Sequence, residues 1–480
     1  METPLRQGLY LSHRQFSNIT NHLIKPVSAR SLALSVLMDW QKPAEGMRKP
    51  VSRLIDAHTR DSFIPSFENA LLHELVYGVL RHKTWLDWRI DAFLREKDLP
   101  LELRTVLELC AFQIDFLNRV PVSAAVNEAV KIVKAGRHSW AAGLVNAVAR
   151  RLSESRANPC SLSPELRRRL DGLPAMKRLS ILFSHSIWLL KRWEARFGTN
   201  GVFSLCRWNN QKAGLCLRVN NLRTTRDALI ESLRQAGFSA RPGKYSPQAL
   251  WLDDFFGNPA TLPGFAEGFF QVQDEAAQLA AYCLHPQPHD VILDFCAGVG
   301  GKTTHLAELT SDEAKIIAYD ISNARLNGLR ENTRRLGLKS IFVLNDYKQL
   351  TSMRFNKILL DAPCSGLGTI RRHPDIKWNR TERFIQESAV KQMKLLHQAA
   401  SLLMPDGLLC YATCTPEPEE TTGVLAAFLN ARKDFESVNP KEFLPKEAGG
   451  LLAQQRFISI MPEENGPDLF FMALLKRKKI

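Results

Sequence analysis

The sequence has 480 residues, of which 45% are hydrophobic and 24% are charged, and its formal net charge is +15. This length and hydrophobic content exclude a disordered chain and a disulfide-stapled miniprotein, and they indicate roughly three domains. The charge favours nucleic acid, an anionic membrane or an acidic protein as a partner. We expect a soluble, cytoplasmic protein, because no hydrophobic run reaches about 18 residues and the nine cysteines show no paired spacing.

The first part of the chain is predicted to be helical. Residues 1–27 lack the pattern of a secretory signal and are interpreted as a flexible extension, with an organellar transit peptide as the alternative. From residue 28 to residue 155, hydrophobic residues recur at three- and four-residue spacing, which predicts an all-helical domain. This domain has no paired carboxylates and no set of metal ligands, so we expect a role in binding or in structural support rather than in catalysis.

Residues 156–285 are predicted to form a basic linker with a small α+β domain, because short alternating runs replace the helical pattern. Residues 151–250 contain 18 Lys and Arg against 6 Asp and Glu, a local net charge of +12. A basic surface with exposed rings suits loop or single-stranded RNA, so we expect an RNA track here. The alternative is a solvated helix face whose rings lie in the core. The aromatic residues interleaved with these bases are Trp188, Trp193, Phe197, Phe203 and Trp208.

From residue 286 to residue 480, short hydrophobic strands alternate with helical stretches. This alternation predicts an α/β domain with a Rossmann-like parallel sheet and right-handed crossovers. Ligands of such sheets bind beyond the carboxyl ends of the strands, so the residues that follow each strand form the candidate site. The expected strands are Val291–Phe295, Ile316–Tyr319, Ile341–Leu344, Lys357–Leu360, Leu408–Tyr411 and Phe470–Leu475.

The first four of these strand ends carry a glycine-rich turn and three acids. The turn Asp294-Phe-Cys-Ala-Gly-Val-Gly-Gly-Lys302 follows the first strand, and the next three strands are followed by Asp320, Asp346 and Asp361. Glycines let the backbone approach a ligand, and an acid about 20 residues beyond such a turn typically binds a ribose diol. The set therefore predicts an adenosine-containing cofactor. A P-loop NTPase is the second interpretation, but Cys296 stands where its first glycine would be.

Two cysteines follow strands at the same edge of the predicted sheet. Cys364 lies in the loop after the fourth strand, and Cys414 lies in the loop after the fifth. A reactive thiol needs partly exposed, electropositive surroundings, whereas cysteines in hydrophobic or periodic stretches are usually structural. We expect the bases near Cys364 to lower a thiol pKa or to hold phosphates. These bases are Arg371, Arg372, His373 and Lys377.

With these motifs in view, the sequence resembles the Sun (RsmB-like) family of RNA cytosine carbon-5 methyltransferases over nearly its whole length. The family commonly has Ala-Ala-Pro-Gly-Gly-Lys where this sequence has Ala297-Gly-Val-Gly-Gly-Lys302. The helical part resembles the NusB-like RNA-binding domain that is fused to these enzymes. The segments that carry the resemblance are Asp361–Trp378, Thr413–Glu420, Leu217–Asn220, Gln271–Ala277, Arg119–Ala129 and Gly143–Ala147.

The resemblance implies that the protein methylates carbon 5 of a cytosine in RNA through a covalent cysteine adduct, with S-adenosylmethionine as the cofactor. The RNA that the resemblance favours is small-subunit (16S) ribosomal RNA. It implies Cys414 as the attacking thiol, Cys364 as the residue that assists release, and Asp361 as a ligand of the base. We expect a monomer without a metal. The cofactor contacts carried over are Cys296, Ala297, Gly298, Val299, Gly300, Gly301, Lys302, Asp320, Arg325, Asp346 and Asp361.

A protein of a different class, a non-catalytic RNA-binding or antitermination factor, is the alternative suggested by the NusB-like helices. Such a factor would have degenerate cofactor and cysteine motifs, whereas this sequence retains both cysteines and the glycine-rich turn. The motifs therefore favour an enzyme.

Overall fold

The structure is a computed structural model in which the chain divides into two units, Met1–Val76 and Tyr77–Ile480, and each is described by itself. The extension predicted at residues 1–27 lies outside the described residues. No helix in the described ranges is both long and apolar enough to cross a membrane. The described residues are 28–42, 48–60, 64–159, 161–253, 255, 257–451, 456–463 and 466–479.

The described part of the first unit is helical. It contains α1 (Ala29–Gln41), α2 (Val51–Thr59) and the beginning of α3 (Ser66–Asp91). The side chain of Ser28 caps α1 by accepting a backbone hydrogen bond, and the carboxylate of Glu68 accepts another from the first residue of that helix at 2.7 Å. These caps satisfy amide groups that have no partner within the helix.

The second unit begins with further helices, as the three- and four-residue spacing predicts. Helix α3 contains a break at His82, where φ is −116° and ψ is 17°. A fully buried ion pair between Arg89 and Asp115, with Nε and Oδ2 3.1 Å apart, ties α3 to α4. The helices that follow α3 are α4 (Leu101–Phe116), α5 (Val122–Ala135), α6 (Ala142–Glu154), α7 (Pro164–Asp171), α8 (Ala175–Phe183) and α9 (Ile187–Asn209).

A small α+β module follows α9, as predicted. Within the described residues its sheet has four antiparallel strands in the order β2-β3-β1-β4. Hydrophobic residues of α10 and of the sheet form one core, to which Leu217, Leu233 and Phe270 belong. The elements of this module are β1 (Leu215–Val219), α10 (Arg226–Gln235), β2 (Ala240–Pro242), β3 (Ala249–Leu252) and β4 (Phe270–Val272).

The last part of the chain forms the predicted α/β sheet, with the strand order β10-β12-β9-β8-β5-β6-β7 and β11 paired to β12. The pairs among β5, β6, β7, β8 and β9 are parallel, which confirms that part of the prediction. The pairs made by β12 are antiparallel, so the prediction of a purely parallel sheet was wrong at this edge. The strands are β5 (Val291–Asp294), β6 (Lys315–Tyr319), β7 (Ile341–Leu344), β8 (Phe355–Asp361), β9 (Leu403–Thr413), β10 (Phe435–Val438), β11 (Phe457–Ile460) and β12 (Phe470–Arg477).

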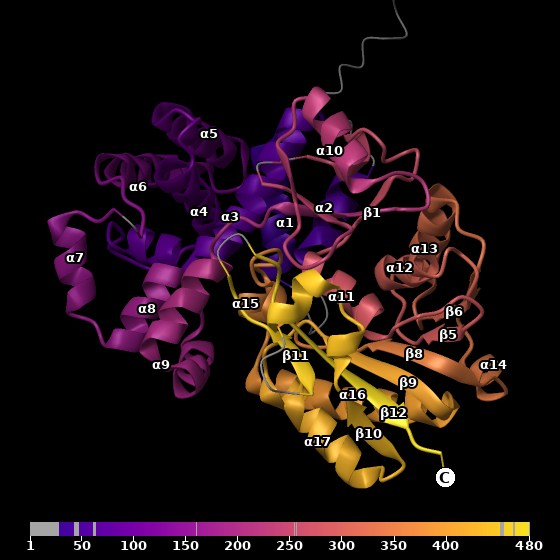
Figure 1. Ribbon diagram of the computed structural model, residues 1–480. Coiled ribbons are helices and arrows are strands. Elements are labelled where there is room, and N and C mark those ends of the chain that lie inside the picture. Colours follow the sequence, from indigo (N-terminus) through magenta and orange to yellow (C-terminus); the bar gives the residue numbers. More distant parts are fainter. Residues whose placement is uncertain are drawn as a thin grey trace, which may run out of the picture. The chain divides into compact units, whose positions relative to one another are not determined.

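Helices cover both faces of this sheet (Figure 1). On one face lie α16 and α17, and on the other lie α11, α12 and α13. The polar side chains of Asp274, Ser322 and Thr381 cap α11, α13 and α16 by accepting backbone hydrogen bonds. The helices are α11 (Glu275–Cys283), α12 (Gly301–Leu309), α13 (Asn323–Leu336), α14 (Tyr347–Thr351), α15 (Ile376–Asn379), α16 (Glu382–Leu402) and α17 (Thr422–Ala431).

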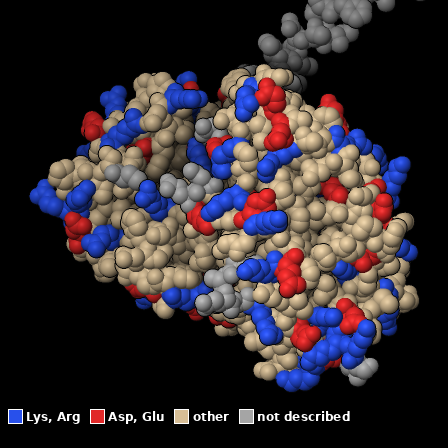
Figure 2. Space-filling view, viewed as in Figure 1, with Lys and Arg blue, Asp and Glu red and all other residues tan. Residues whose placement is uncertain are grey.

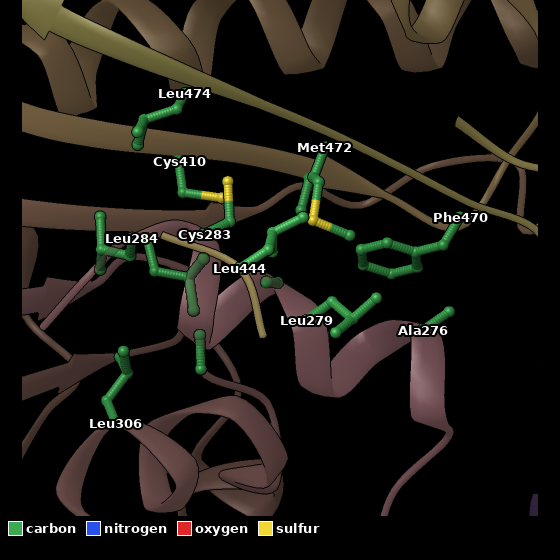
Figure 3. Packing of buried hydrophobic residues seen from close by; sticks show 14 of the residues in the cluster. Ala276, Leu279, Cys283, Leu284, Leu306, Cys410, Leu444, Phe470, Met472 and Leu474 are labelled. Carbon is green, nitrogen blue, oxygen red and sulfur yellow. The ribbon is translucent and has the colours of Figure 1, made fainter. Parts of the chain in front are cut away.

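Successive residues of the strands contribute to two different cores, one on each face. In β9, Cys410 belongs to the core under α11 and α12, whereas its neighbour Tyr411 belongs to the core under α16 and α17. This alternation follows from the two-residue period of a strand. Figure 3 shows Cys283 of α11 and Cys410 pointing toward one another in the first core, where both side chains are fully buried. They pack as small hydrophobic residues, as predicted for them.

Candidate active site at the strand ends

The glycine-rich turn joins the end of β5 to the start of α12. Gly298 and Gly300 have positive φ angles of 58° and 87°, a conformation that glycine adopts without strain. The backbone N–H of Gly298 donates to Oδ2 of Asp320 at 3.0 Å, so the acid at the end of β6 holds the turn in place. Gly300 lies against Leu329 of α13, where an added Cβ would come within 2.8 Å of the leucine side chain.

A buried arginine from the neighbouring module supports the helix that follows this turn. Arg218 of β1 is fully buried and donates to Oγ1 of Thr304 at 2.9 Å and to the carboxylate of Glu308 at 2.7 Å. It also donates to the backbone carbonyl of Gly301, the first residue of α12. The Leu217–Asn220 segment singled out in the sequence therefore contacts the cofactor turn through its arginine.

A cavity of about 940 Å³ opens at the carboxyl ends of β5, β6, β8 and β9. This is the edge at which the parallel strand arrangement predicts a ligand site. Of the predicted site residues, the lining includes Cys296, Ala297, Gly298, Val299, Gly301, Lys302, Asp320, Arg325, Asp361, Cys364 and Cys414.

Two predicted cofactor contacts do not line the cavity. Gly300 is the N-cap of α12 and packs against α13 instead. Asp346 is the N-cap of α14, where its side chain accepts the backbone N–H of Lys348 at 2.9 Å. A carboxylate that follows a strand and precedes a helix serves equally well as a helix cap, which explains the difference.

The lining also includes residues that strand-end reasoning did not select. Ile321 is 85% exposed, which is unusual for a large hydrophobic side chain. Its place directly after the predicted site residue Asp320 was the signal available in the sequence. Lys391 and Lys394 lie on α16, in the middle of a helix, where the sequence pattern carries no sign of a site. The further lining residues are Gln273, Ala277, Asp294, Phe295, Tyr319, Tyr347, Ala362, Pro363, Leu395 and Gln398.

Three carboxylates line the cavity together with several cations. Burial raises the pKa of Asp294 to about 6. The hydrogen bond from Thr303 lowers this pKa, but by less than burial raises it. Nζ of Lys302 donates to Oδ2 of Asp361 at 2.6 Å. Burial alone would lower the pKa of Lys302, but the facing Asp361 carboxylate outweighs it and the net pKa is raised. Lys302 therefore stays a cation and neutralises Asp361, and Arg325 lies 3.7 Å from the carboxylate of Asp320. Lys391 and Lys394 add further positive charge to the lining.

The two predicted cysteines meet in this cavity. The Sγ atoms of Cys364 and Cys414 are 3.3 Å apart, and both side chains are half-buried. The hydrogen bond with Cys414, together with burial, raises the pKa of Cys364 well above its ordinary value. Cys364 therefore keeps its proton at neutral pH.

The carboxylate of Glu420 links the loops that carry the two cysteines. It accepts the backbone N–H of Ser365 at 2.7 Å and the hydroxyl of Thr415 at 3.1 Å, and these residues directly follow Cys364 and Cys414. Gln392 of α16 donates to it at 3.1 Å. Burial raises the pKa of Glu420, while these hydrogen bonds oppose that shift. Glu420 belongs to the segment Thr413–Glu420 that carries part of the resemblance, and its contacts hold the two loops together.

The bases near Cys364 in the sequence, which could lower a thiol pKa or hold phosphates, make their contacts away from the two thiols. Arg372 forms ion pairs with Asp274 at 2.7 Å and Asp468 at 2.6 Å. Arg371 also pairs with Asp468, at 3.1 Å. Lys377 is buried and donates to the backbone carbonyl of residue 81 at 3.1 Å. None of Arg371, Arg372, His373 and Lys377 lines the cavity.

The cations whose charges act on the thiols are Lys302 and Arg380. Arg380 donates from Nε to the backbone carbonyl of Ser365 at 2.7 Å, next to Cys364. Burial lowers the pKa of Arg380, and the neighbouring Asp375 and thiols oppose the shift. Arg380 comes two residues after the signature segment that the sequence analysis considered, and for that reason it was not selected.

Comparisons with known proteins match this architecture part by part. Residues 281–476 match the family described as 16S rRNA methyltransferase RsmB/F. Residues 27–154 match the NusB family, and residues 185–257 match the ferredoxin-like domain of RsmF/B-like methyltransferases. The helical, α+β and α/β parts predicted from the sequence therefore each correspond to a known domain.

Individual relatives extend over nearly the full chain. It is 33% identical over 461 residues to "Probable ribosomal RNA small subunit methyltransferase B" of Synechocystis sp., covering 94% of this chain and 100% of the relative. It is 38% identical over 376 residues to ribosomal RNA small subunit methyltransferase B of Salmonella newport, covering 76% and 83%.

Among solved structures, the crystal structure of PH0851 has the same fold, with a TM-score of 0.75, 24% identity and coverage of 94% and 98%. The match in sequence to the Synechocystis relative and the match in fold each cover 94% of this chain. The chain belongs to the RsmB (Sun) family of ribosomal RNA small subunit methyltransferases, with a NusB-like helical domain and a ferredoxin-like module before a Rossmann-like methyltransferase domain.

Proposed function

We propose that this protein methylates carbon 5 of a cytosine in small-subunit (16S) ribosomal RNA, with S-adenosylmethionine as the methyl donor and a cysteine–cytosine adduct as the intermediate. The observation that carries the proposal is the pair of thiols, 3.3 Å apart, in a cavity that also contains the glycine-rich turn. Carbon 5 of cytosine is too electron-poor to attack a methyl donor until a nucleophile adds to carbon 6. A thiol at this point of the cavity supplies that nucleophile.

The lining of the cavity fits S-adenosylmethionine, which supplies an electrophilic methyl group on a positively charged sulfur. Gly298 and Gly301 have open space where a Cβ would stand, so the backbone is accessible to a ligand. Oδ1 of Asp294 is buried without a hydrogen-bond partner, which suits a ligand ammonium group. Asp320 stands where a ribose diol is bound in such folds.

The same carboxylates argue against the P-loop NTPase. Asp294, Asp320 and Asp361 all line the cavity beside the turn, and the ammonium of Lys302 is already paired with Asp361. The lysine of the turn is therefore not free to bind a triphosphate as a P-loop lysine does. The non-catalytic alternative leaves the meeting of the two thiols unexplained.

The proposed reaction uses three side chains of this chain. The Cys414 thiolate adds to carbon 6, and the electron pair of the 5,6 double bond moves to carbon 5. Carbon 5 then bonds to the methyl carbon while the bond from that carbon to the donor sulfur breaks, and the electron pair of this bond stays on the sulfur, which leaves as a neutral thioether. A base then removes the proton from carbon 5, the double bond re-forms, and the bond to Cys414 breaks with its electrons returning to sulfur. Cys364 retains its proton and assists this release. Asp361 hydrogen-bonds the polar edge of the base.

A direct test measures methyl incorporation and maps its position. Purified protein with S-adenosylmethionine should methylate 16S ribosomal RNA transcripts, and bisulfite sequencing should find one protected cytosine in a loop or unpaired stretch, because the base must leave its stack. RNA from a deletion strain should lack this protection. Methylation at another atom, detected as a methylated nucleoside other than 5-methylcytidine, would refute the proposed chemistry.

The cofactor affinity should depend on pH through Asp294. Because its pKa is about 6, the carboxylate is mostly neutral at pH 5 and mostly ionised at pH 7. The ionised form attracts the cationic donor, so the dissociation constant should fall by up to about tenfold between pH 5 and pH 7. Isothermal titration of wild type and Asp294→Asn checks this. The variant should bind more weakly at pH 7 and lose the pH dependence, and an unchanged profile in the variant would contradict the assignment.

The basic stretch from residue 151 to residue 250 is only in part an exposed surface. Trp193 and Trp208 are buried in a core, so these rings are not available to stack on RNA bases, whereas Phe203 is 47% exposed. The arginines of α7, Arg167 and Arg168 among them, are exposed, and Figure 2 shows Lys and Arg side chains gathered over this helix at the left edge of the view. We propose this exposed part as the surface that binds the RNA backbone.

Reversing two charges on α7 should weaken RNA binding without changing the chemistry. Arg167→Glu combined with Arg168→Glu should reduce RNA affinity about tenfold at 0.1 M salt and make its salt dependence less steep by about two phosphate contacts. The rate at saturating RNA should stay unchanged. The matched control, Lys441→Glu with Lys446→Glu, reverses two exposed charges elsewhere. Equal RNA affinity of the α7 variant and wild type across a salt titration would exclude this surface.

A further inference from the structure

Helix α9, outside the methyltransferase domain, contacts the loop that carries Cys414. Nε1 of Trp193 donates to Oε1 of Glu417 at 3.0 Å. One turn further along, Nη2 of Arg196 donates to the backbone carbonyl of Pro416 at 2.8 Å. These contacts join residues more than 200 positions apart in the sequence, and they fall within three residues of the cysteine.

Arg192 binds the same loop with both sides of its guanidinium group. Its Nε contacts the carboxylate of Glu417, and its Nη2 contacts the carboxylate of Glu419. The Glu417 side chain is fully buried, so its charge depends on these partners from α9. A planar guanidinium that binds two carboxylates fixes the orientation of the loop and also its distance from α9.

The same helix also packs against the loop that carries Cys364. Trp193, Leu189 and other residues of α9 share a hydrophobic core with Leu367 and Ile370, which lie three and six residues beyond that cysteine. Trp193 thus belongs to both contacts, since its ring lies in the core and its N–H reaches Glu417. One helix therefore fixes both loops, in addition to the link made by Glu420.

We infer that Arg192 and Trp193 are positioning residues for the nucleophile, and that α9 sets the place of Cys414 relative to Cys364. This inference rests on the proposed function, because it concerns the geometry of the thiol that attacks. The residues act through Glu417 and do not touch the substrate. A displacement of about 1 Å at a reacting atom can lower a rate about a hundredfold. Contacts that hold the Cys414 loop in place therefore affect the rate of the chemical step.

The test compares Trp193→Phe and Arg192→Gln with Lys191→Gln, a control that removes an exposed charge from the same helix. Trp193→Phe keeps an aromatic ring in the core and removes only the N–H donor. We expect it to lower kcat about tenfold, and Arg192→Gln to lower it up to about a hundredfold, with KM for RNA and the Kd for S-adenosylmethionine within about twofold of wild type. Lys191→Gln should behave as wild type.

A second readout keeps the inference independent of the proposed reaction. The rate at which iodoacetamide alkylates Cys414, followed by peptide mass spectrometry, should change in Trp193→Phe and Arg192→Gln but not in Lys191→Gln. If wild type methylates no RNA while these alkylation rates still differ, the proposed function fails and the positioning role stands. If kcat and the alkylation rate both stay within about twofold of wild type in folded Trp193→Phe and Arg192→Gln, the positioning role is refuted.

Discussion

Replacing Cys414 with alanine is expected to abolish methyl transfer to RNA. The proposed reaction has no route that bypasses addition to carbon 6, so kcat should fall by at least about 10⁴-fold. Cys414 lies at the end of β9 and is half-buried, and its removal leaves the glycine-rich turn and Asp294 in place. Transfer of a labelled methyl group from S-adenosylmethionine to RNA measures the loss.

Two controls separate lost chemistry from lost structure in this variant. The Kd for S-adenosylmethionine and the midpoint of thermal unfolding should both stay close to the wild-type values. Retention of more than about 1% of the wild-type rate in Cys414→Ala would show that another group makes the adduct or that no adduct is needed.

Replacing Cys364 with alanine should have the opposite signature, an accumulation of the covalent complex. Cys364 lies 3.3 Å from the attacking sulfur and has a raised pKa, so it holds a proton next to the bond that must break. Without it the adduct forms and is released slowly. Most of the Cys364→Ala protein should then migrate with RNA on a denaturing gel, whereas wild type should show almost none.

The same gel also shows whether the roles of the two cysteines are assigned correctly. A denaturant-resistant complex that accumulates in Cys414→Ala, and not in Cys364→Ala, would mean that the roles of the two thiols are exchanged. The double variant should form no complex, because it lacks the attacking sulfur whatever the role of the other residue.

Most of the site could be predicted from the sequence, because residues that follow parallel strands are placed by local pattern and sheet topology alone. Once Val291–Phe295 and Lys357–Leu360 are recognised as parallel strands, Asp320, Asp361 and Cys364 must come to one edge. The structure places them in one cavity. Asp346, predicted from the same pattern, caps α14 and does not line the cavity.

The contacts that could not be predicted are those between segments far apart in the sequence. Arg192 and Arg196 counted toward a basic track because a charge count cannot show that Glu417 lies opposite them. Arg372 looked like an activator of Cys364 because it is near in sequence, yet it pairs with Asp274 and Asp468.

The direction of the last strand has a similar explanation. Phe470–Leu475 is a continuous hydrophobic run, and such a run has the same composition in a parallel and an antiparallel strand buried on both faces. The structure places β12 antiparallel to β9. Only the pairing partners decide the direction, and they are not readable from one sequence.

In the proposed mechanism, Cys414 bonds to carbon 6 of a cytosine during the reaction. Mass spectrometry of the complex trapped by Cys364→Ala, after digestion of both RNA and protein, tests it most directly. We predict a single peptide containing Cys414 that carries one methylated cytosine nucleotide. A nucleotide attached to any other residue, or full methylation of the RNA with no cysteine-linked nucleotide detectable, would contradict the mechanism.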